Sequence, residues 1–316
     1  MPPAAPTVPE QTGKLTAAEA SAQVGIPLDQ AKKLWRAMGF PEAGAEALYD
    51  EADVETLRQV RSVIDSGVID VDLAVNIARG LGQTMARLSD WQVSALIQRV
   101  EDVTGTSDTT AVLHAARELS DEFSPIFEDV LVYAWRRHIA AALGRLEASS
   151  QEEHGTVQLT VGFADIVSFT ALSNTLTEDK IGDLVELFES RCADVVAVQH
   201  GRIIKSLGDS VLFVNDDPIR AYDTAAGIIN VIGRDPRMPD VRLGLATGSV
   251  VMRLGDVFGP PVNMAARLTA VARRNRIIID ERTAEMLPED QFETRRLPAR
   301  PVRGFGIVEP VAVTRA

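Results

Sequence analysis

Two carboxylates and a lysine interrupt apolar segments in the middle of the chain. Asp165 lies within VGFADIVSFTAL, and Lys205 and Asp209 lie four positions apart in GRIIKSLGDSVLF. An unpaired buried carboxylate is costly, so each aspartate in such a segment is expected to have a cation. Two hard oxygen ligands suit Mg²⁺ or Mn²⁺, which binds through one or two carboxylates together with substrate phosphates. The alternative for an aspartate beside a glycine is a purely structural place in a turn.

The composition is that of a folded, acidic protein of about two domains. The 316 residues are 46% hydrophobic and 24% charged, and the formal net charge is -13. This balance argues against binding nucleic acid over a broad face, which needs clustered Lys and Arg. Cys192 is the only cysteine, which excludes intramolecular disulfides and a zinc–thiolate cluster within one chain and indicates a reducing compartment.

The N-terminus carries no pattern of a signal peptide. Residues 1–14 are rich in Pro and Thr with almost no large apolar side chains, so we expect a disordered tail. Nowhere do about 18 apolar residues follow one another without a charge. We therefore expect a cytoplasmic protein with no membrane segment.

Residues 15–148 have the spacing of helices and are predicted to form one all-helical domain. Thr16, with Glu19 three residues later, forms a candidate capping box, and Gly25 ends that first helix. Further helical segments are predicted at 26–40, 50–67, 70–101 and 110–123. A long helix from about Pro125 to Ala148 is predicted to end the domain as a linker.

From Val157 the pattern changes to short β-branched segments that alternate with helices, in a domain predicted to span residues 149–316. Strands are predicted at 157–167, 202–206 and 210–214, and a strand pair at 241–253. Helices are predicted at 177–200, 217–234 and 258–273. The resulting βαββαβ order predicts an α+β fold with helices packed on one sheet.

Three motifs in this second half carry a resemblance to a known family. FADIVSFTAL, GRIIKSLGDSVLF and GDVFGPPVNMAARL, in this order and spacing, resemble the catalytic domain of class III adenylate cyclases of the soluble, actinobacterial type, over about residues 155–315. The resemblance implies a ferredoxin-like domain that works as a head-to-tail homodimer with two active sites at the interface. It also implies conversion of ATP into 3′,5′-cyclic AMP and pyrophosphate.

The resemblance assigns a role to each matching residue. Asp165 and Asp209 correspond to the ligands of two Mg²⁺ or Mn²⁺ ions, and the backbone carbonyl of Ile166 to a further ligand. Asn263 and Arg267, four apart and hence on one helix face, correspond to the residues that hold the ribose and stabilise the transition state.

Two further assignments concern the ends of the nucleotide. Lys205 and Asp256 correspond to the pair that reads adenine, and their chemistry agrees: a lysine only donates, to N1, and an ionised aspartate only accepts, from the N6 amino group. Guanine presents the reverse pattern, so the pair is expected to reject GTP. Arg303, in PVRGFG, matches the place of a basic residue for the terminal phosphates.

The spacing of Lys205 and Asp209 fits a shared site. Four extended residues span about 13 Å, too far for both side chains to serve the same few atoms of one substrate from one chain. In a two-fold dimer Asp209 would hold metal in one site while Lys205 reaches the base in the other. A monomer is expected to be inactive.

The sequence departs from the family pattern at three places. Gly162 lies where a larger apolar residue is usual before the first aspartate, Ser210 follows the second aspartate, and Thr314 replaces a frequent aromatic residue. None of these departures removes a group to which the resemblance assigns chemistry.

The helical half, over residues 14–67, resembles a MerR-like helix-turn-helix. One interpretation places Lys32, Lys33 and Arg36 on DNA phosphates, which would make the protein a nucleotide-sensing transcription regulator. The interpretation we favour, given the acidic surroundings and the fused catalytic domain, is a helical domain that regulates the enzyme through its last helix. A guanylate cyclase is the third alternative, which Lys205 and Asp256 disfavour.

Overall fold

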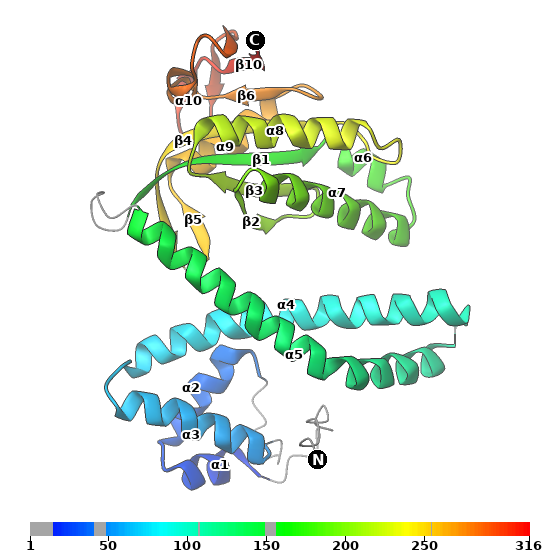
Figure 1. Cartoon of the computed structure of the whole chain (residues 1–316), viewed down its shortest axis with the longest axis vertical. Coiled ribbons are helices and arrows are strands. Elements are labelled where there is room, and N and C mark those ends of the chain that lie inside the picture. The colour runs from blue at the N-terminus through cyan, green and yellow to red at the C-terminus, as the bar shows by residue number, and fades with distance from the viewer. Residues whose placement is uncertain (1–14, 41–48, 107, 149–155, 254) are drawn as a thin grey trace. The chain divides into compact units, whose positions relative to one another are not determined.

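The structure is a computed structural model that describes residues 15–40, 49–106, 108–148, 156–253 and 255–316. Its contacts divide the chain into two compact units, residues 1–144 and 145–316, which are described separately below (Figure 1). The predicted domain boundary after residue 148 stays a prediction. The predicted disordered tail at 1–14 lies outside the described residues.

The described part of the N-terminal unit is helical, as predicted. Its helices are α1 (Ala17–Val24), α2 (Leu28–Met38), α3 (Glu51–Asp65), α4 (Val71–Thr104) and α5 (Thr109–Ala148). The capping box at the start of α1 is confirmed, because the side chain of Thr16 accepts from the backbone N–H of Glu19 and Glu19 accepts from the backbone N–H of Thr16. Gly25 ends α1 in the left-handed conformation, and α2 follows directly.

The prediction of two separate helices on either side of Pro125 is wrong. The structure has a single helix, α5, with Pro125 inside it. Proline fixes φ near the helical value, so within a long helix its main effect is to remove one backbone hydrogen bond and bend the axis. Helical residues on both sides keep the helix continuous through that point.

A small core holds α1, α2 and α3 together. Trp35 is 2% exposed and stacks on Tyr49, with the ring centroids 4.0 Å apart. Val54 and Leu57 of α3 are buried in the same cluster. This core explains why three short helices, each too short to be stable alone, are ordered together.

The C-terminal unit is built on one mixed sheet of eight strands. The strands are β1 (Val157–Ile166), β2 (Arg202–Ser206), β3 (Ser210–Asn215), β4 (Val241–Arg253), β5 (Asp256–Phe258), β6 (Ile277–Ile279), β7 (Phe292–Arg296) and β10 (Val311–Arg315). The strand order is β2-β3-β1-β4-β6-β10-β7, with β5 paired to β4. The first four strands pair antiparallel, as expected for the predicted ferredoxin-like βαββαβ core. A separate pair, β8 (Arg300–Val302) and β9 (Gly306–Val308), forms a hairpin.

Helices cover both faces of this sheet. They are α6 (Phe169–Ser173), α7 (Glu178–Val198), α8 (Pro218–Gly233), α9 (Pro260–Val271) and α10 (Glu281–Met286). α7 and α8 bury Phe188, Cys192 and Ile228 on one face, which Figure 1 shows nearest the viewer. α9 buries Ala265 and Leu268 on the other face. The prediction of helices packed on one sheet therefore holds, with α9 opposite the other two.

The predicted strand pair at 241–253 is wrong, since β4 is one continuous strand of 13 residues. Gly248 and Ser249 suggest a turn in the sequence, but Gly248 instead lies where a side chain would meet Pro261 at the start of α9. The glycine here serves close packing, not a turn.

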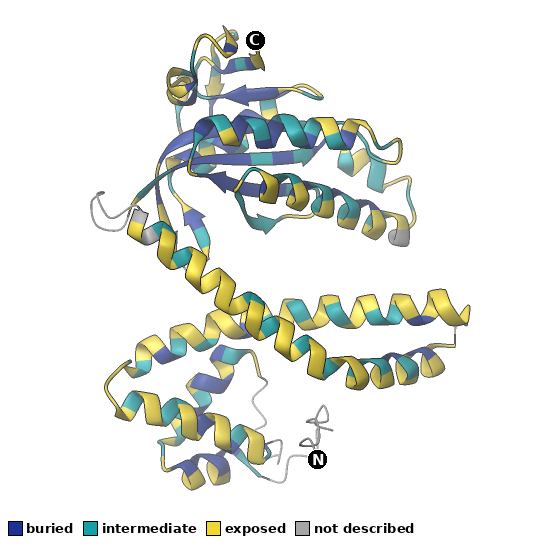
Figure 2. Cartoon of the chain, viewed as in Figure 1, coloured by how far each residue is buried: buried dark blue, intermediate teal, exposed yellow. Residues whose placement is uncertain are grey.

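Burial follows the same division into strands and helices. Figure 2 shows the strands of the C-terminal unit largely buried and α5 exposed along most of its length. Among the described residues, no helix is both long enough and apolar enough to cross a membrane.

Candidate active site

The carboxylate of Asp165 is held at the end of β1 by two neighbouring strands. The register places Asp165 opposite Ser210 of β3 and opposite Arg242 of β4. Ser210 Oγ donates to Asp165 Oδ1 at 2.5 Å, and Arg242 Nε donates to Oδ2 at 2.7 Å. Nη2 of the same arginine lies 2.6 Å from Oδ2 and completes the ion pair. The side chain is 13% exposed, so a largely buried charge is compensated as expected.

Asp209 lies next to this carboxylate because the turn between β2 and β3 is bonded to the end of β1. The backbone N–H of Ile166 donates to the carbonyl oxygen of Asp209 at 3.0 Å. The pKa of Asp209 is raised above its ordinary value by burial and then by the nearby charge of Asp165. The structure thus brings together Asp165, Ile166 and Asp209, the three predicted metal ligands.

These residues suit a hard divalent cation that is completed by a substrate. Within the described residues no group of three or more His, Cys, Asp and Glu side chains could enclose a metal by itself. Two adjacent carboxylates match Mg²⁺ or Mn²⁺, which keeps positions for water and phosphate oxygens. Burial and the charge of Asp165 both raise the pKa of Asp209, and a bound cation would compensate for both.

Lys205 and Asp256 form a second group. Lys205 is on β2 and Asp256 begins β5, and Lys205 Nζ lies 2.6 Å from Asp256 Oδ2. The backbone N–H of Val257 also donates to Asp256, at 2.8 Å. Burial opposes ionisation of Asp256, but the bonds from Lys205 and Val257 outweigh it and lower its pKa. Asp256 is therefore ionised at neutral pH and accepts a hydrogen bond, while Lys205 donates one.

Asn263 and Arg267 lie on α9 with exposed side chains, while Ala265 and Leu268 of the same helix are buried against the sheet. Gly244 on β4 permits this packing, since a Cβ there would overlap the backbone of α9 at Ala265. Within the part of the chain that the structure describes, Asn263 and Arg267 have no hydrogen bond or ion pair through their side chains. Both side chains are available to a ligand or to a second chain.

Side-chain alternation places these groups on one face of the sheet. Asp165 shares a face with Phe163 and Val161, two and four residues earlier on β1, which pack in the cluster beneath α9. Lys205 is opposite Leu212, another member of that cluster. The candidate site residues therefore lie on the face of the sheet that α9 covers. The other face, under α7 and α8, is packed with apolar side chains.

Arg303 lies apart from both groups. It is an exposed residue in the turn of the β8–β9 hairpin, outside the main sheet. No bond between its side chain and another predicted site residue occurs in the described structure. Its assignment to the terminal phosphates stays a prediction.

Sequence reasoning missed Arg242 and gave Ser210 no role. The signal for Arg242 was the arginine at the second position of an otherwise apolar strand, VRLGLATG, where a side chain on a covered face needs a partner. Ser210 was noted only as a departure after Asp209. In the structure both side chains bond to the carboxylate of Asp165 and fix its position.

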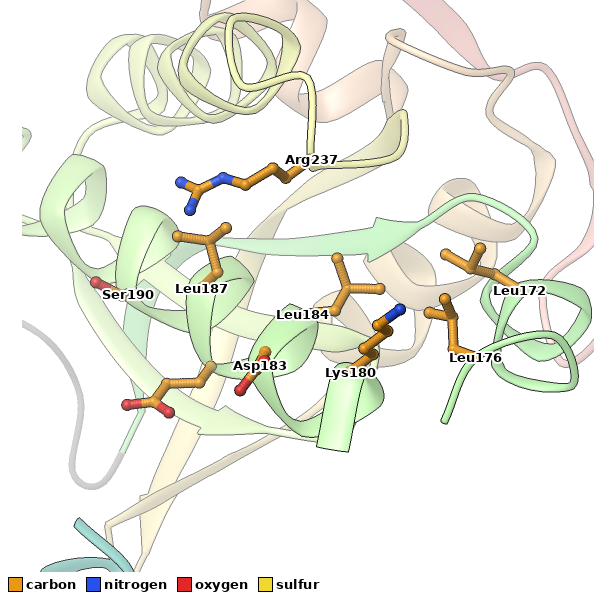
Figure 3. Close-up of a pocket in the computed structure, with 9 residues that line it drawn as sticks. Leu172, Leu176, Lys180, Asp183, Leu184, Leu187, Ser190 and Arg237 are labelled. Atoms are coloured by element: carbon orange, nitrogen blue, oxygen red, sulfur yellow. The ribbon is translucent and has the colours of Figure 1, made fainter. Parts of the chain in front are cut away.

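A hollow of about 740 Å³ lies elsewhere in the C-terminal unit (Figure 3). Leucines of α6, α7 and the segment between them form its apolar wall, and Lys180 and Arg237 are at its edge (Figure 3). None of its lining residues belongs to the groups around Asp165 or Lys205, so it is not part of the candidate active site.

Comparison with known proteins gives a consistent family. Residues 151–313 match the family profile described as the adenylate and guanylate cyclase catalytic domain, and residues 7–139 match one described as the adenylate cyclase regulatory domain. The chain is similar to a protein of Streptomyces coelicolor named adenylate cyclase, at 36% identity over 96% of this chain and 86% of that protein. A Streptomyces griseus protein of the same name is 34% identical, with the same coverage of both chains. A solved catalytic core of a rhodopsin-guanylyl cyclase with converted specificity, in complex with ATPαS, is 25% identical and covers 51% of this chain and 97% of that one, with a TM-score of 0.48.

Proposed function

The chain belongs to the class III adenylate cyclases, and we propose that it converts ATP into 3′,5′-cyclic AMP and pyrophosphate at active sites that two copies of the chain share. The observation that carries the choice of ATP is the pair formed by Lys205 and Asp256, at 2.6 Å. A donor-only and an acceptor-only side chain at one place match N1 and the N6 amino group of adenine. Guanine would meet a donor with a donor and an acceptor with an acceptor, which disfavours the alternative of a guanylate cyclase.

Asp165, Asp209 and the carbonyl of Ile166 would hold two Mg²⁺ or Mn²⁺ ions. The chemistry supplied by bound ions is acidification of the ribose 3′-hydroxyl and neutralisation of the triphosphate. Ser210 and Arg242 would keep the carboxylate of Asp165 in one orientation, so that little reorganisation is needed when a ligand binds.

On α9, Asn263 would position the ribose so that the 3′-hydroxyl faces the α-phosphate, and Arg267 would donate to the charge that develops there. Arg303 is proposed for the terminal phosphates. Because Asn263 and Arg267 are exposed and Lys205 is already paired with Asp256, these four residues can act on a nucleotide without breaking the core.

The separation of the two groups supports a site shared between copies. Lys205, which bonds Asp256, and Asp209, which lies beside Asp165, are four residues apart in the sequence. Four extended residues span about 13 Å, too far for both side chains to act on the same few atoms of one substrate. A head-to-tail homodimer would let the metal-binding group of one copy and the adenine-reading pair of the other serve one ATP.

We propose further that the N-terminal helical unit regulates the enzyme through α5, which precedes β1 in the sequence. The match to an adenylate cyclase regulatory domain supports this proposal. A cytoplasmic location is proposed because the single cysteine indicates a reducing compartment and the sequence has no long apolar segment. The alternative of a DNA-binding regulator would depend on Lys32, Lys33 and Arg36 of α2, and a gel shift with genomic fragments would reveal it.

Two experiments test the proposed function. Incubation of the full chain with Mn²⁺ and either ATP or GTP, followed by identification of the cyclic product, tests the reaction and the choice of base. Mixing an Asp165→Asn chain with a Lys205→Ala chain tests the shared site, because each mixed pair has one intact site while each variant alone has none. Failure of the mixture to recover activity, with mixed pairs demonstrated by differently tagged chains, would contradict the shared site.

A further inference from the structure

A hollow of about 670 Å³ lies between α2 and α4 of the N-terminal unit. Lys33 and Arg36 of α2 line one side of it, and Asp72, Asn76 and Arg79 of α4 line the other. The spacing of three or four residues along each helix places each group on one helix face. Three cations and one carboxylate therefore line the hollow, in a chain whose formal net charge is -13. This local excess of positive charge in an acidic protein indicates a site for an anion.

The packing of the two helices fixes the walls of the hollow (Figure 1). Trp35 of α2 and Ala74 of α4 are buried in the same core cluster. Further along α4, Gly82 lies so close to the end of α2 that a Cβ there would overlap the backbone of Met38. Close-packed helices form rigid walls, so the polar side chains between them extend from fixed positions.

The charged groups of the hollow do not neutralise one another. Within the described residues the side chains of Lys33, Asp72 and Arg79 form no ion pair or hydrogen bond. Arg36 donates Nε to the backbone carbonyl oxygen of Lys32 at 3.4 Å, which directs its side chain along α2. By contrast, the arginines of α3 pair with carboxylates of their own helix. At least one lysine and one arginine of the hollow are therefore available to a ligand.

The three cations have the chemistry of a phosphate site. A guanidinium donates two parallel hydrogen bonds to phosphate oxygens, and a lysine adds a compact charge. A helix that reads the major groove of DNA needs a free face, whereas α4 stands opposite Lys33 and Arg36 across the hollow. A small phosphate compound therefore fits this place better than a DNA duplex does.

The other polar groups indicate what the phosphate is attached to. Asp72, when ionised, only accepts hydrogen bonds, and Asn76 both donates and accepts. A bare phosphate would be repelled by Asp72, whereas a hydroxyl group would donate to it. The described lining holds no aromatic side chain on which a nucleotide base could stack. Sugar hydroxyls meet these requirements, and a hollow of this volume has room for a sugar as well as its phosphate.

We propose that the N-terminal unit binds a sugar phosphate between α2 and α4. Lys33, Arg36 and Arg79 hold the phosphate, and Asp72 and Asn76 bind hydroxyl groups of the sugar. The ligand contacts both helices and so stabilises their packing by mass action. Binding is measured without turnover, so this proposal and the proposed reaction can fail independently.

Isothermal titration calorimetry with the full chain tests the site. The probes are glucose 6-phosphate, ribose 5-phosphate and glycerol 3-phosphate, and the controls are inorganic phosphate and glucose, all at one ionic strength. At least one probe should have a Kd about tenfold or more below that of inorganic phosphate, because its hydroxyls add bonds to Asp72 and Asn76. Glucose should not bind measurably, because it has no charge. Failure of all three probes to bind, or binding no tighter than that of inorganic phosphate, would overturn the proposal.

A matched pair of substitutions locates the binding. Arg79→Ala should raise the Kd of the tightest probe by about tenfold or more, because a charged hydrogen bond to phosphate is lost. Arg87→Ala changes an exposed arginine about two turns later on α4, outside the hollow, and should leave the Kd unchanged. Circular dichroism checks that both variants keep their helix content. An equal effect of the two substitutions would mean that binding follows net charge, and would overturn the proposal.

Asp72→Ala distinguishes a sugar phosphate from a simple anion. The substitution removes a charge that repels phosphate and also removes an acceptor for a hydroxyl group. Inorganic phosphate should therefore bind more tightly and the probe less tightly, so that the preference for the probe falls by about tenfold. An unchanged preference would mean an anion site without a contact to the sugar, and would overturn the proposal.

Discussion

Lys205 Nζ and Asp256 Oδ2 lie 2.6 Å apart, although the two residues come from strands that are not neighbours in the sheet. The pair neutralises two charges that would otherwise be costly to hold partly buried. A base that offers an acceptor to the lysine and a donor to the aspartate can replace this bond with two others. A base without that pattern must break the pair and leave at least one charge without a partner. The pair therefore favours adenine over guanine.

Lys205→Ala should lower kcat/KM for ATP by roughly 10- to 100-fold, because a hydrogen bond from a charged donor is lost and Asp256 is left unpaired. Activity with GTP should change little, so that the ratio between the two substrates falls. Lys180→Ala, which changes an exposed lysine of α7, is the control and should leave both values unchanged. Equal loss with ATP and GTP would contradict a role in choosing the base.

Asp209→Asn should abolish turnover and yet stabilise the protein in the absence of divalent metal. Burial and the charge of Asp165 raise the pKa of Asp209 above its ordinary value of 3.8, so the folded state binds the proton more tightly than the unfolded state does. Ionisation of Asp209 therefore reduces stability, and this penalty is fully present only above the raised pKa. At pH 7 we expect a small rise in Tm, because the side chain of Asp209 is only partly buried and solvent screens part of the penalty.

The pH dependence of that difference is diagnostic. As pH falls through the raised pKa toward 3.8, Asp209 takes up its proton and the gain in Tm from Asp209→Asn should vanish. Asp216→Asn, at a carboxylate that is 64% exposed, should produce no gain at either pH. Thermal melts in a chelating buffer at pH 4 and pH 7 make the comparison. A lower Tm for Asp209→Asn at pH 7 would show that the charge is favourable in the folded state.

Arg267→Ala should lower kcat by about 10²–10³ while changing the binding of ATP much less, because the proposed contact strengthens only as charge develops at the α-phosphate. Its side chain is exposed on α9, so the fold should be unaffected. Arg274→Ala, at an exposed arginine just after the same helix that pairs with Asp240, is the matched control. Loss of ATP binding in proportion to kcat would assign Arg267 to binding of the ground state.

The fold was predictable where the local sequence pattern agrees with the final packing. Thr16 and Glu19 satisfy each other at a helix start whatever surrounds them, and the β-branched runs of β1 and β3 have no stable alternative to a buried sheet. Pro125 and Gly248 led to wrong predictions, because proline normally ends a helix and glycine normally interrupts a strand. In the structure α5 continues through Pro125, and Gly248 is needed because Pro261 packs closely against it. Such context is not present in the neighbouring sequence.

The candidate site was predictable in its residues and not in its contacts. Motifs identified Asp165, Asp209, Lys205 and Asp256, and the structure places each pair together. Arg242 was missed because its partner is 77 residues away in sequence, and only the register of β1 with β4 places them side by side. The residues around Arg242 in β4 give no sign that it pairs with a carboxylate on another strand.

Gly162 is needed because of Phe213, which lies directly opposite it on β3. A Cβ at position 162 would overlap the ring of Phe213, so the aromatic ring fills the space that a larger residue would occupy. Gly162→Ala should reduce the free energy of unfolding by about 1–3 kcal/mol, and adding Phe213→Leu should recover part of that loss. The double-mutant cycle should therefore show a coupling of at least about 0.5 kcal/mol.

Gly182→Ala, in α7, is the control for this cycle, because nothing lies within 4 Å of its added Cβ. There alanine should stabilise the helix by up to about 1 kcal/mol, and it should add independently to Phe213→Leu. Urea unfolding of the full chain, followed through the sheet signal, supplies the four free energies of each cycle. Additive effects of Gly162→Ala and Phe213→Leu would mean that the ring does not set the requirement for glycine, and that this departure from the family pattern has another cause.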